Sequence, residues 1–272
     1  MDNARQSYTR IPDRSFPVSI ALHHFPLPGP IFTSHWHEHF QFIYCLKGEA
    51  WIYCNGNPLH LTAGDAMVIN INEMHYGESL TGDMSYYVIM IDSSFILSNQ
   101  VDACQTKYIS PLTRNQLLFD NQISDDKDLV DCIKKMIQEY NAQTTGFELA
   151  VKSCIYNAMV LLLRKHVLRS FSTKEYDLQA AGMKRLQSVF DYMKNNYTQI
   201  IDLQELAGIA GLSTGHFCRI FKKLTGRSAV DYLNQLRVEK AVTLLRQGEC
   251  NIKEIALATG FTDSNYFTRV FK

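Results

Sequence analysis

Three histidines and a glutamine stand at spacings that could hold a ligand. His35, His37 and Gln41 fall within one short segment, and His75 follows in a later one. Three imidazoles are good ligands for zinc, iron or nickel, although the missing carboxylate would weaken such a site. The same side chains could instead hydrogen-bond the hydroxyl groups of a small polar molecule. A third interpretation is a hydrogen-bonded core without a ligand, and the residues alone leave all three open.

A second group of polar side chains belongs to an internal repeat near the C-terminus. The segment 205–211 recurs at 254–260, and the segment 217–222 recurs at 267–272. Each copy is typical of a helix, a glycine turn and a second helix, because Gly211 and Gly260 can adopt the positive φ that ends a helix sharply. The second helix of each copy carries exposed polar side chains, namely Thr214, His216, Arg219, Lys222 and Lys223 in one and Ser264, Asn265, Thr268, Arg269 and Lys272 in the other.

These side-chain types suit contacts with double-stranded DNA. Arginine can bridge the O6 and N7 atoms of guanine, and asparagine can bridge N6 and N7 of adenine. Lysine suits phosphate oxygens. Any one of these residues could belong to an ordinary solvated face, but the duplication of the whole set favours two DNA-reading helices.

Two kinds of element must position these groups. From residue 20 to residue 92, short segments alternate polar and apolar side chains between Gly and Asn turns, which predicts a barrel or sandwich of strands. Alternation along 35–43 predicts that His35, His37, His39 and Gln41 share one strand face. From residue 124 the apolar period is helical, and two strongly apolar helices over 123–168 need a partner surface, either the strands or a second subunit.

The C-terminal part resembles the AraC/XylS family of bacterial transcription regulators. The segments 241–245, 252–256 and 260–272 carry the resemblance to the family signature, and the match covers about residues 182–272. The resemblance implies two helix-turn-helix units joined by a long helix, which contact adjacent major grooves about 34 Å apart. It places Arg237 in the linking helix, in a structural role or near phosphate. The family normally continues with a glycine turn and a last short helix, so the resemblance implies a truncated end at Lys272.

The N-terminal part resembles a cupin. Gly29, His35, His37, Gln41 and Gly48 match the first cupin motif, with Gln where Glu is usual. Gly64 and His75 match the second motif, in which Asn70, Asn72 and Ser79 replace Pro, Gly and Asn. The resemblance implies a sensor for a small polar, sugar-like effector. We expect no cofactor. We expect the effector-binding residues to be His35, His37, Gln41, Tyr44, Trp51, Tyr53 and His75. The alternative is a divalent transition metal held by His35, His37, Gln41 and His75, in a sensor or in an enzyme fused to a DNA-binding module.

The sequence as a whole predicts an α+β multidomain protein. We expect an N-terminal arm (1–19), a cupin-like β-barrel (20–122), a helical dimerisation segment (123–168), a linker (169–181) and an all-α DNA-binding domain (182–272). The expected partners are a double-stranded DNA operator, the small-molecule effector, a second copy in a homodimer and RNA polymerase. The expected function is that of an effector-responsive transcription activator. We expect no enzyme activity, since no catalytic triad, P-loop or dinucleotide fingerprint is present.

Charge and composition further limit the classes of protein to which the chain can belong. The chain has 272 residues with 27 Lys and Arg and 27 Asp and Glu, which excludes a strongly basic protein that coats nucleic acid. Residues 1–172 hold 13 basic and 17 acidic side chains and residues 173–272 hold 14 and 10, so the net charges of the two parts are −4 and +4. The sequence lacks a signal-peptide pattern, a long apolar span and a C-x-x-C pair, so we expect a cytoplasmic protein with reduced thiols and no membrane partner.

Overall fold

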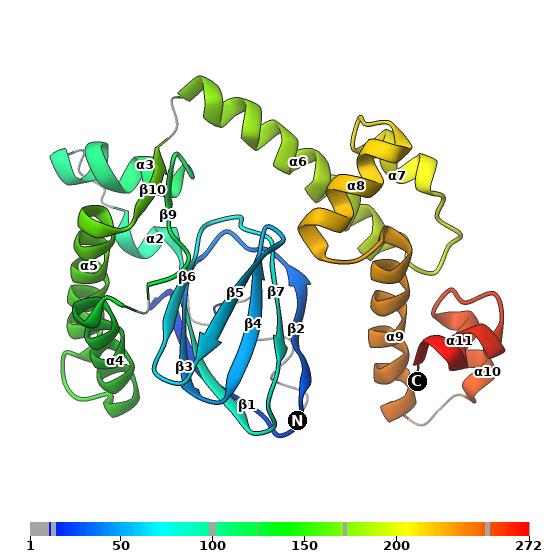
Figure 1. Ribbon diagram of the computed structural model, residues 1–272, viewed down its shortest axis with the longest axis horizontal. Helices are drawn as coiled ribbons and strands as arrows, with labels where there is room; N and C mark the ends of the chain where they lie inside the picture. The colour runs from blue at the N-terminus through cyan, green and yellow to red at the C-terminus, as the bar shows by residue number, and fades with distance from the viewer. Residues whose placement is uncertain are drawn as a thin grey trace. The chain divides into compact units, whose positions relative to one another are not determined.

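The computed structural model describes residues 11, 15–97, 102–123, 125–170, 173–247 and 251–271. The chain divides into two compact units, Met1–Tyr176 and Asp177–Lys272. The first unit contains two β-sheets and a layer of helices, and the second is helical (Figure 1). The α+β class expected from the sequence is therefore confirmed.

Two four-stranded antiparallel sheets face each other in the first unit. One has the order β1-β8-β3-β6, formed by Val18–Phe25, Met84–Ile91, Phe40–Lys47 and Ala66–Ile69. The other has the order β2-β7-β4-β5, formed by Gly29–His35, His75–Ser79, Glu49–Cys54 and Asn57–Thr62. The expected closed barrel is wrong, because among the described strands no hydrogen-bonded ladder joins one sheet to the other. The domain is a two-sheet sandwich.

Strand β3 shows why the first sheet is buried on both faces. Ile43 and Cys45 point between the sheets, where they pack with Ile52 of β4. Phe40 and Phe42 alternate with them and belong to a second core on the outer face. Because a sheet covered on both faces needs apolar residues at nearly every position, β3 reads as a continuous apolar run.

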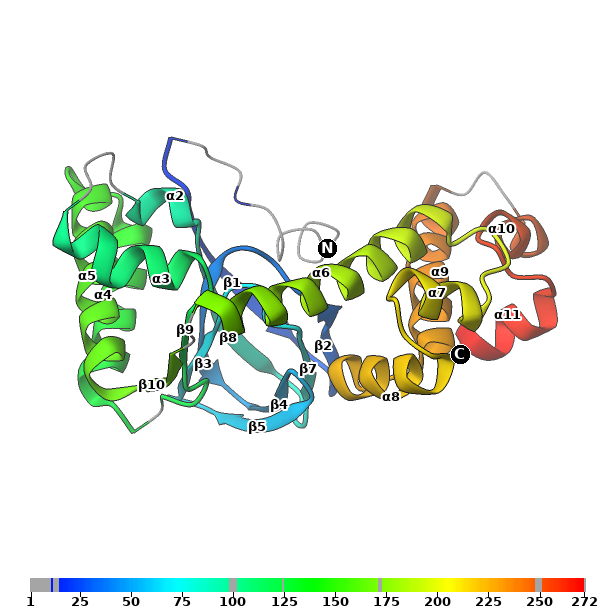
Figure 2. The ribbon, with the colours of Figure 1, turned by 90° about the horizontal axis from the view of Figure 1, so that it is seen from above.

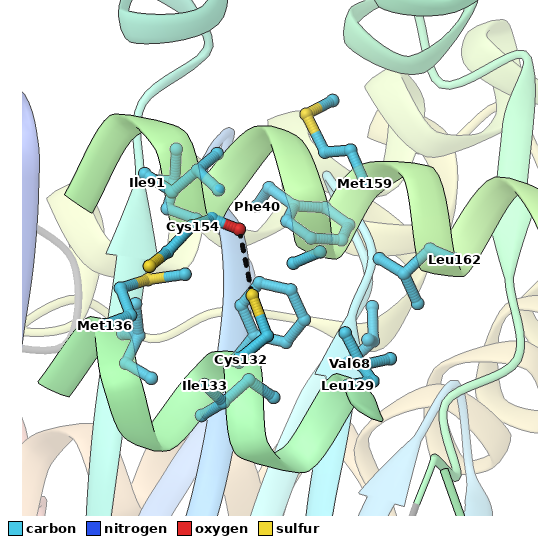
Figure 3. Close-up of a cluster of buried hydrophobic side chains, with 14 of the residues drawn as sticks. Phe40, Val68, Ile91, Leu129, Cys132, Ile133, Met136, Cys154, Met159 and Leu162 are labelled. Atoms are coloured by element: carbon cyan, nitrogen blue, oxygen red, sulfur yellow. Dashed lines mark hydrogen bonds between the residues drawn. The ribbon is translucent and has the colours of Figure 1, made fainter. Parts of the chain in front are cut away.

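Two long helices cover the outer face of the first sheet (Figure 2). Helix α4 (Lys127–Ala142) begins at Asp126, whose carboxylate accepts a hydrogen bond from Leu129 N at 3.2 Å. Helix α5 (Phe147–Lys165) packs antiparallel to α4, and Figure 3 shows Leu129, Met136 and Met159 gathered over the strands. Between the helices, Cys132 Sγ donates to the carbonyl of Cys154 at 3.1 Å (Figure 3).

Short elements complete the first unit. Helix α2, the π-helical turn η2 and helix α3 span Ser93–Ile96, Gln105–Ile109 and Ser110–Thr113. Strand β9 (Leu117–Phe119) pairs with β10 (Val167–Ser170). The six cysteines that the structure describes are all free thiols.

The predicted linker at 169–181 contains the start of a helix. Helix α6 spans Thr173–Asn196, and the boundary between the two units falls within it, between Tyr176 and Asp177. The polar, mixed composition of this stretch predicts a linker, and the boundary between the two units does fall within it. Lys, Glu, Gln and Ala, however, are also strong helix formers, so a polar segment of this kind is equally compatible with a solvated helix.

The second unit consists of α6 from Asp177 onward and five further helices among its described residues. They are α7, α8, α9, α10 and α11, which span Leu203–Ile209, Thr214–Thr225, Ala229–Gln247, Ile252–Ala258 and Ser264–Phe271. Phe190, Phe221 and Tyr232 bring α6, α8 and α9 together, with ring centroids 5.2–5.6 Å apart. In the part of the chain that the structure describes, no helix is both long and apolar enough to span a membrane.

Candidate functional site

The repeat seen in the sequence is reproduced in the hydrogen bonds of the second unit. Leu212 N donates to Ala207 O at 2.9 Å, and Phe261 N donates to Ala256 O at the same distance. Gly211 and Gly260 lie immediately before the two donor residues and have φ of +64° and +87°. The pairs α7–α8 and α10–α11 are therefore two helix-turn-helix units with the same turn geometry.

Helices α8 and α11 direct the predicted DNA-binding side chains to solvent. On α8, His216, Arg219, Lys222 and Lys223 are exposed and Thr214 is half-buried. On α11, Asn265, Thr268 and Arg269 are exposed and Ser264 is half-buried. The opposite faces bury Phe217, Phe221 and Phe267. Lys272 lies outside the described residues. The geometry leaves both polar faces available to a major groove.

Arg237, on the long helix α9, forms hydrogen bonds to the segment that follows α6. Its side chain is 9% exposed, and its guanidinium donates from Nε to Tyr197 O and from Nη2 to Gln199 O, both at 2.7 Å. The guanidinium also lies 5.7 Å from the ring centroid of Phe261. Of the two roles that the family resemblance left open, this geometry describes the structural one.

Three histidines of the first unit, His35, His37 and His75, come together at one end of the sandwich. His35 ends β2 and lies opposite His75, the first residue of β7. His37 lies in the connection to β3, which Asn72 N holds by donating to His37 O at 2.9 Å. The ring centroids of His35 and His37 lie 4.3 and 5.0 Å from that of His75. The expectation of one continuous strand face over 35–43 is wrong, because β2 ends at His35 and β3 begins at Phe40.

Backbone carbonyls orient all three imidazole rings in the same way. His35 Nδ1 donates to Thr33 O at 2.7 Å, and His37 Nδ1 donates to His39 O at 3.0 Å. His75 Nδ1 donates to Glu73 O at 2.8 Å. A proton held on Nδ1 leaves the Nε2 lone pair available, which is the arrangement found around protein metal ions. One nitrogen from each ring lies within 4.8 Å of the others. The cluster has the donor set and spacing for a transition metal.

Burial keeps these rings neutral. Desolvation lowers the pKa of His35 and His75, and lowers the pKa of His37 to about 3. The His75 ring is fully buried, and its Nε2 has no hydrogen-bond partner among the described residues. A buried nitrogen without a partner is unfavourable unless a ligand occupies its lone pair.

Gln41 reaches the same cluster from the other sheet. Its Oε1 lies 2.7 Å from His37 Nε2, and its side chain is 2% exposed. Because His37 Nδ1 already donates to a carbonyl, Nε2 presents a lone pair to Gln41. Either the amide turns its NH₂ group to the ring, or a cation accepts both lone pairs. The predicted set His35, His37, Gln41 and His75 is thus brought together.

The three aromatic residues expected in the same pocket lie elsewhere. Tyr44 is on the outer face of the first sheet, where Lys134 Nζ lies 5.8 Å from its ring centroid. Trp51 and Tyr53 alternate with the buried, inward-facing Ile52 and therefore point away from the sandwich interior. On the outer face, the Trp51 ring lies tilted at 4.9 Å from His60, and the Tyr53 ring stacks on Tyr76 at 4.4 Å. The predicted aromatic walls are wrong because strand alternation divides these residues among different faces.

Sequence reasoning missed a buried carboxylate next to the histidines. Glu73 accepts hydrogen bonds from Asn70 N and from the side chains of Asn55, Asn70 and Asn121. Burial raises the pKa of its carboxyl, against these hydrogen bonds. Asn72 has φ of +58°, a conformation that asparagine tolerates and that explains its presence where the cupin motif has glycine. The available signal was therefore the Asn-rich segment itself.

Comparison with known proteins identifies both units. A family model for the AraC-like ligand binding domain matches residues 17–159, more than half of the chain, and a helix-turn-helix domain model matches residues 206–272. The chain belongs to the AraC family of transcription regulators. The expected resemblance is confirmed, and the protein is a DNA-binding regulator with a ligand-binding domain and not an enzyme.

Two sequence relatives agree with this assignment, and one solved structure is similar in fold. An uncharacterized HTH-type transcriptional regulator from Bacillus subtilis, YdeC, is 26% identical over 245 residues, which cover 88% of this chain and 81% of the relative. The lactose operon transcription activator of Staphylococcus xylosus is 24% identical, with 83% and 76% covered. The structure of fatty-acid-bound ToxT from Vibrio cholerae is similar at a TM-score of 0.48 and 17% identity, with 94% and 90% covered.

Proposed function

We propose that this regulator is an activator that binds an operator through α8 and α11, each inserted into one of two adjacent major grooves. The supporting observation is the duplicated helix-turn-helix with exposed Arg219 and Arg269 in its two reading helices. Arginine in such a position reads guanine. Lysines 222 and 223 of α8 supply phosphate contacts, and RNA polymerase is the partner through which activation would occur.

Operator titrations test the reading helices. Arg219→Ala and Arg269→Ala should each weaken binding to a selected DNA fragment by about 1–3 kcal/mol, or about 5- to 150-fold. Lys194→Ala on α6 is a control because it removes one exposed charge away from both faces. If the two arginine variants bind as tightly as Lys194→Ala, the assignment of the reading helices is wrong.

The effector that the sensor geometry supports best is a divalent transition metal. Its ligands would be Nε2 of His35, His37 and His75, with Gln41 Oε1 as a fourth. The observation that carries this proposal is the set of three converging imidazoles, each oriented by a backbone carbonyl. Because His75 and Gln41 belong to different sheets, occupancy would tie the two sheets together at this end of the sandwich.

Metal analysis of the full chain tests the sensor proposal. After dialysis against zinc, iron or nickel, the protein should retain about one ion per chain, and His75→Gln should lose it. His60→Gln removes an exposed histidine of β5, outside the cluster, and this variant should retain the ion. Circular dichroism checks that each variant is folded. Wild-type protein without stoichiometric metal, or His75→Gln that binds as wild type does, would overturn the proposal.

A small sugar-like molecule is the second candidate effector. It is favoured by the similarity to a relative named as a lactose operon activator, and by the donors that His35, His37, His75 and Gln41 offer to hydroxyl groups. A thermal-shift screen with sugars and metals separates the candidates, since a ligand at 100 times its Kd adds about 2.7 kcal/mol of stability. Stabilisation by a sugar in EDTA, lost in His75→Gln, would favour this candidate over the metal.

The regulator acts as a homodimer in this proposal, with α5 at the interface. Tyr156 and Val160 are each 39% exposed on this helix, one turn apart, and the Tyr156 hydroxyl donates to Ile96 O at 3.4 Å. Two such faces would bury each other at an isologous contact. A dimer would also increase operator affinity by pairing two half-sites.

A further inference from the structure

A cleft of about 380 Å³ lies in the first unit, away from the histidine cluster. It is bounded by the residues that lead into β1, by α2 and by the tip of the α4–α5 hairpin. Its size lies within the range of small-molecule sites in proteins. None of its lining residues belongs to the predicted effector or metal sites.

Aromatic side chains form one side of this cleft. Phe16 lies between three rings, with centroids 5.1 Å from Phe95, 5.5 Å from Phe147 and 6.3 Å from Tyr140. Phe95 and Phe147 present edges to Phe16, at interplanar angles of 85° and 65°. All four rings pack against the core and remain partly exposed. Such a wall favours a flat apolar ring, which can stack or meet the ring edges.

One lysine gives the cleft a cationic end. Lys152 Nζ lies 4.7 Å from the ring centroid of Phe95, and its side chain forms no ion pair with any described residue. Glu148, one turn earlier on α5, is the acidic residue of the lining, and it is exposed. Lys152 is half-buried against the Phe95 ring whereas Glu148 is exposed, so solvent screens the charge of Lys152 less than that of Glu148.

We propose that this cleft binds a small molecule that joins a flat apolar ring to a carboxylate. The ring lies against Phe16, Phe95 and Phe147, and the carboxylate accepts a charge-assisted hydrogen bond from Lys152 Nζ. Because its walls come from the segment before β1, from α2 and from the α4–α5 hairpin, an occupied cleft holds these three segments together. The site is a second ligand site of the sensor, separate from the histidine cluster.

Calorimetric titration with two matched probes tests this proposal. 2-Naphthoate carries the ring and the carboxylate, whereas 2-naphthamide carries the same ring without the charge. The full chain should bind 2-naphthoate more tightly than 2-naphthamide. Lys152→Gln should weaken 2-naphthoate binding about five- to tenfold and leave 2-naphthamide binding nearly unchanged, while Lys152→Arg should retain the preference.

Two further variants sharpen the test. Glu148→Gln should tighten 2-naphthoate binding about two- to threefold, since it removes a like charge. Lys135→Gln on α4, outside the cleft lining, should bind both probes as wild type does. The titrations are performed in EDTA without DNA, so their outcome is independent of the metal and operator proposals. Absence of 2-naphthoate binding at millimolar concentration, equal affinity for both probes, or an unchanged affinity in Lys152→Gln would overturn the proposal.

Discussion

The two turn glycines of the repeat should differ sharply in their tolerance of alanine. Both have positive φ, so a Cβ at either position costs about 1–2 kcal/mol from backbone strain alone. At Gly260 a Cβ would also lie 2.5 Å from Tyr197 O and 2.7 Å from Thr198 Cα. At Gly211 the nearest atom is the guanidinium nitrogen Nη1 of Arg185, at 3.8 Å, an ordinary contact.

Alanine at Gly260 costs more stability because backbone atoms would have to move. The atoms in its way are backbone, and Arg237 holds that backbone through hydrogen bonds to Tyr197 O and Gln199 O. Hydrogen bonds to charged groups contribute about 1.5–3 kcal/mol each. We therefore expect Gly211→Ala to cost about 1–2 kcal/mol and Gly260→Ala about 4 kcal/mol, with the loss of one such bond added to the strain.

Thermal unfolding of the full chain can separate the two units. Both tryptophans, Trp36 and Trp51, lie in the first unit, whereas circular dichroism at 222 nm also follows the helices of the second. For a domain of this size, 1 kcal/mol corresponds to about 4–8 °C. Gly211→Asn should recover most of the loss because asparagine tolerates positive φ, while Gly260→Asn should not. Equal shifts for Gly211→Ala and Gly260→Ala would refute the close approach at Gly260.

Three further predictions concern the first unit. Burial lowers the pKa of His23 from 6.5 to about 4. The protein should therefore lose about 3 kcal/mol of its free energy of unfolding as the pH falls from 6.5 to 4, because the unfolded chain takes up a proton that the folded chain does not. In urea unfolding, His23→Asn should show a flatter pH dependence of stability, and an unchanged dependence would contradict the lowered pKa of His23. Asn72→Ala should cost about 1 kcal/mol while Asn72→Gly is nearly neutral, measured by tryptophan fluorescence, and the reverse order would argue against the positive φ. Val160→Glu should convert the proposed dimer to monomer in sedimentation velocity, whereas Lys135→Glu should not; a persistent Val160→Glu dimer would place the interface elsewhere.

The sequence predicted those features best that a local residue pattern determines. The repeat at Gly211 and Gly260 determined both helix-turn-helix units, and the motif spacing brought His35 and His75 together although they are distant in sequence. It failed where the outcome depends on distant packing. Tyr44 was misplaced because β3 is apolar on both faces, and its alternation therefore gives no direction.

Other features depended on contacts that no local pattern contains. Glu73 is satisfied partly by Asn121, 48 residues further along the chain. The sandwich was predicted as a closed barrel because closure depends on pairing between strands that are distant in sequence. The predicted linker at 169–181 contains the boundary between the two units, but its polar composition did not show that α6 begins there, because a polar run is compatible with both a loop and a solvated helix.

The most direct test of the account is the operator affinity of the full chain with and without metal. If ion binding at His35, His37 and His75 controls DNA binding, zinc-loaded and EDTA-treated protein should differ about 5- to 150-fold in Kd for the same selected fragment. His75→Gln should give one affinity in both conditions. Identical affinities for wild-type protein that demonstrably binds and releases the ion would contradict the central claim.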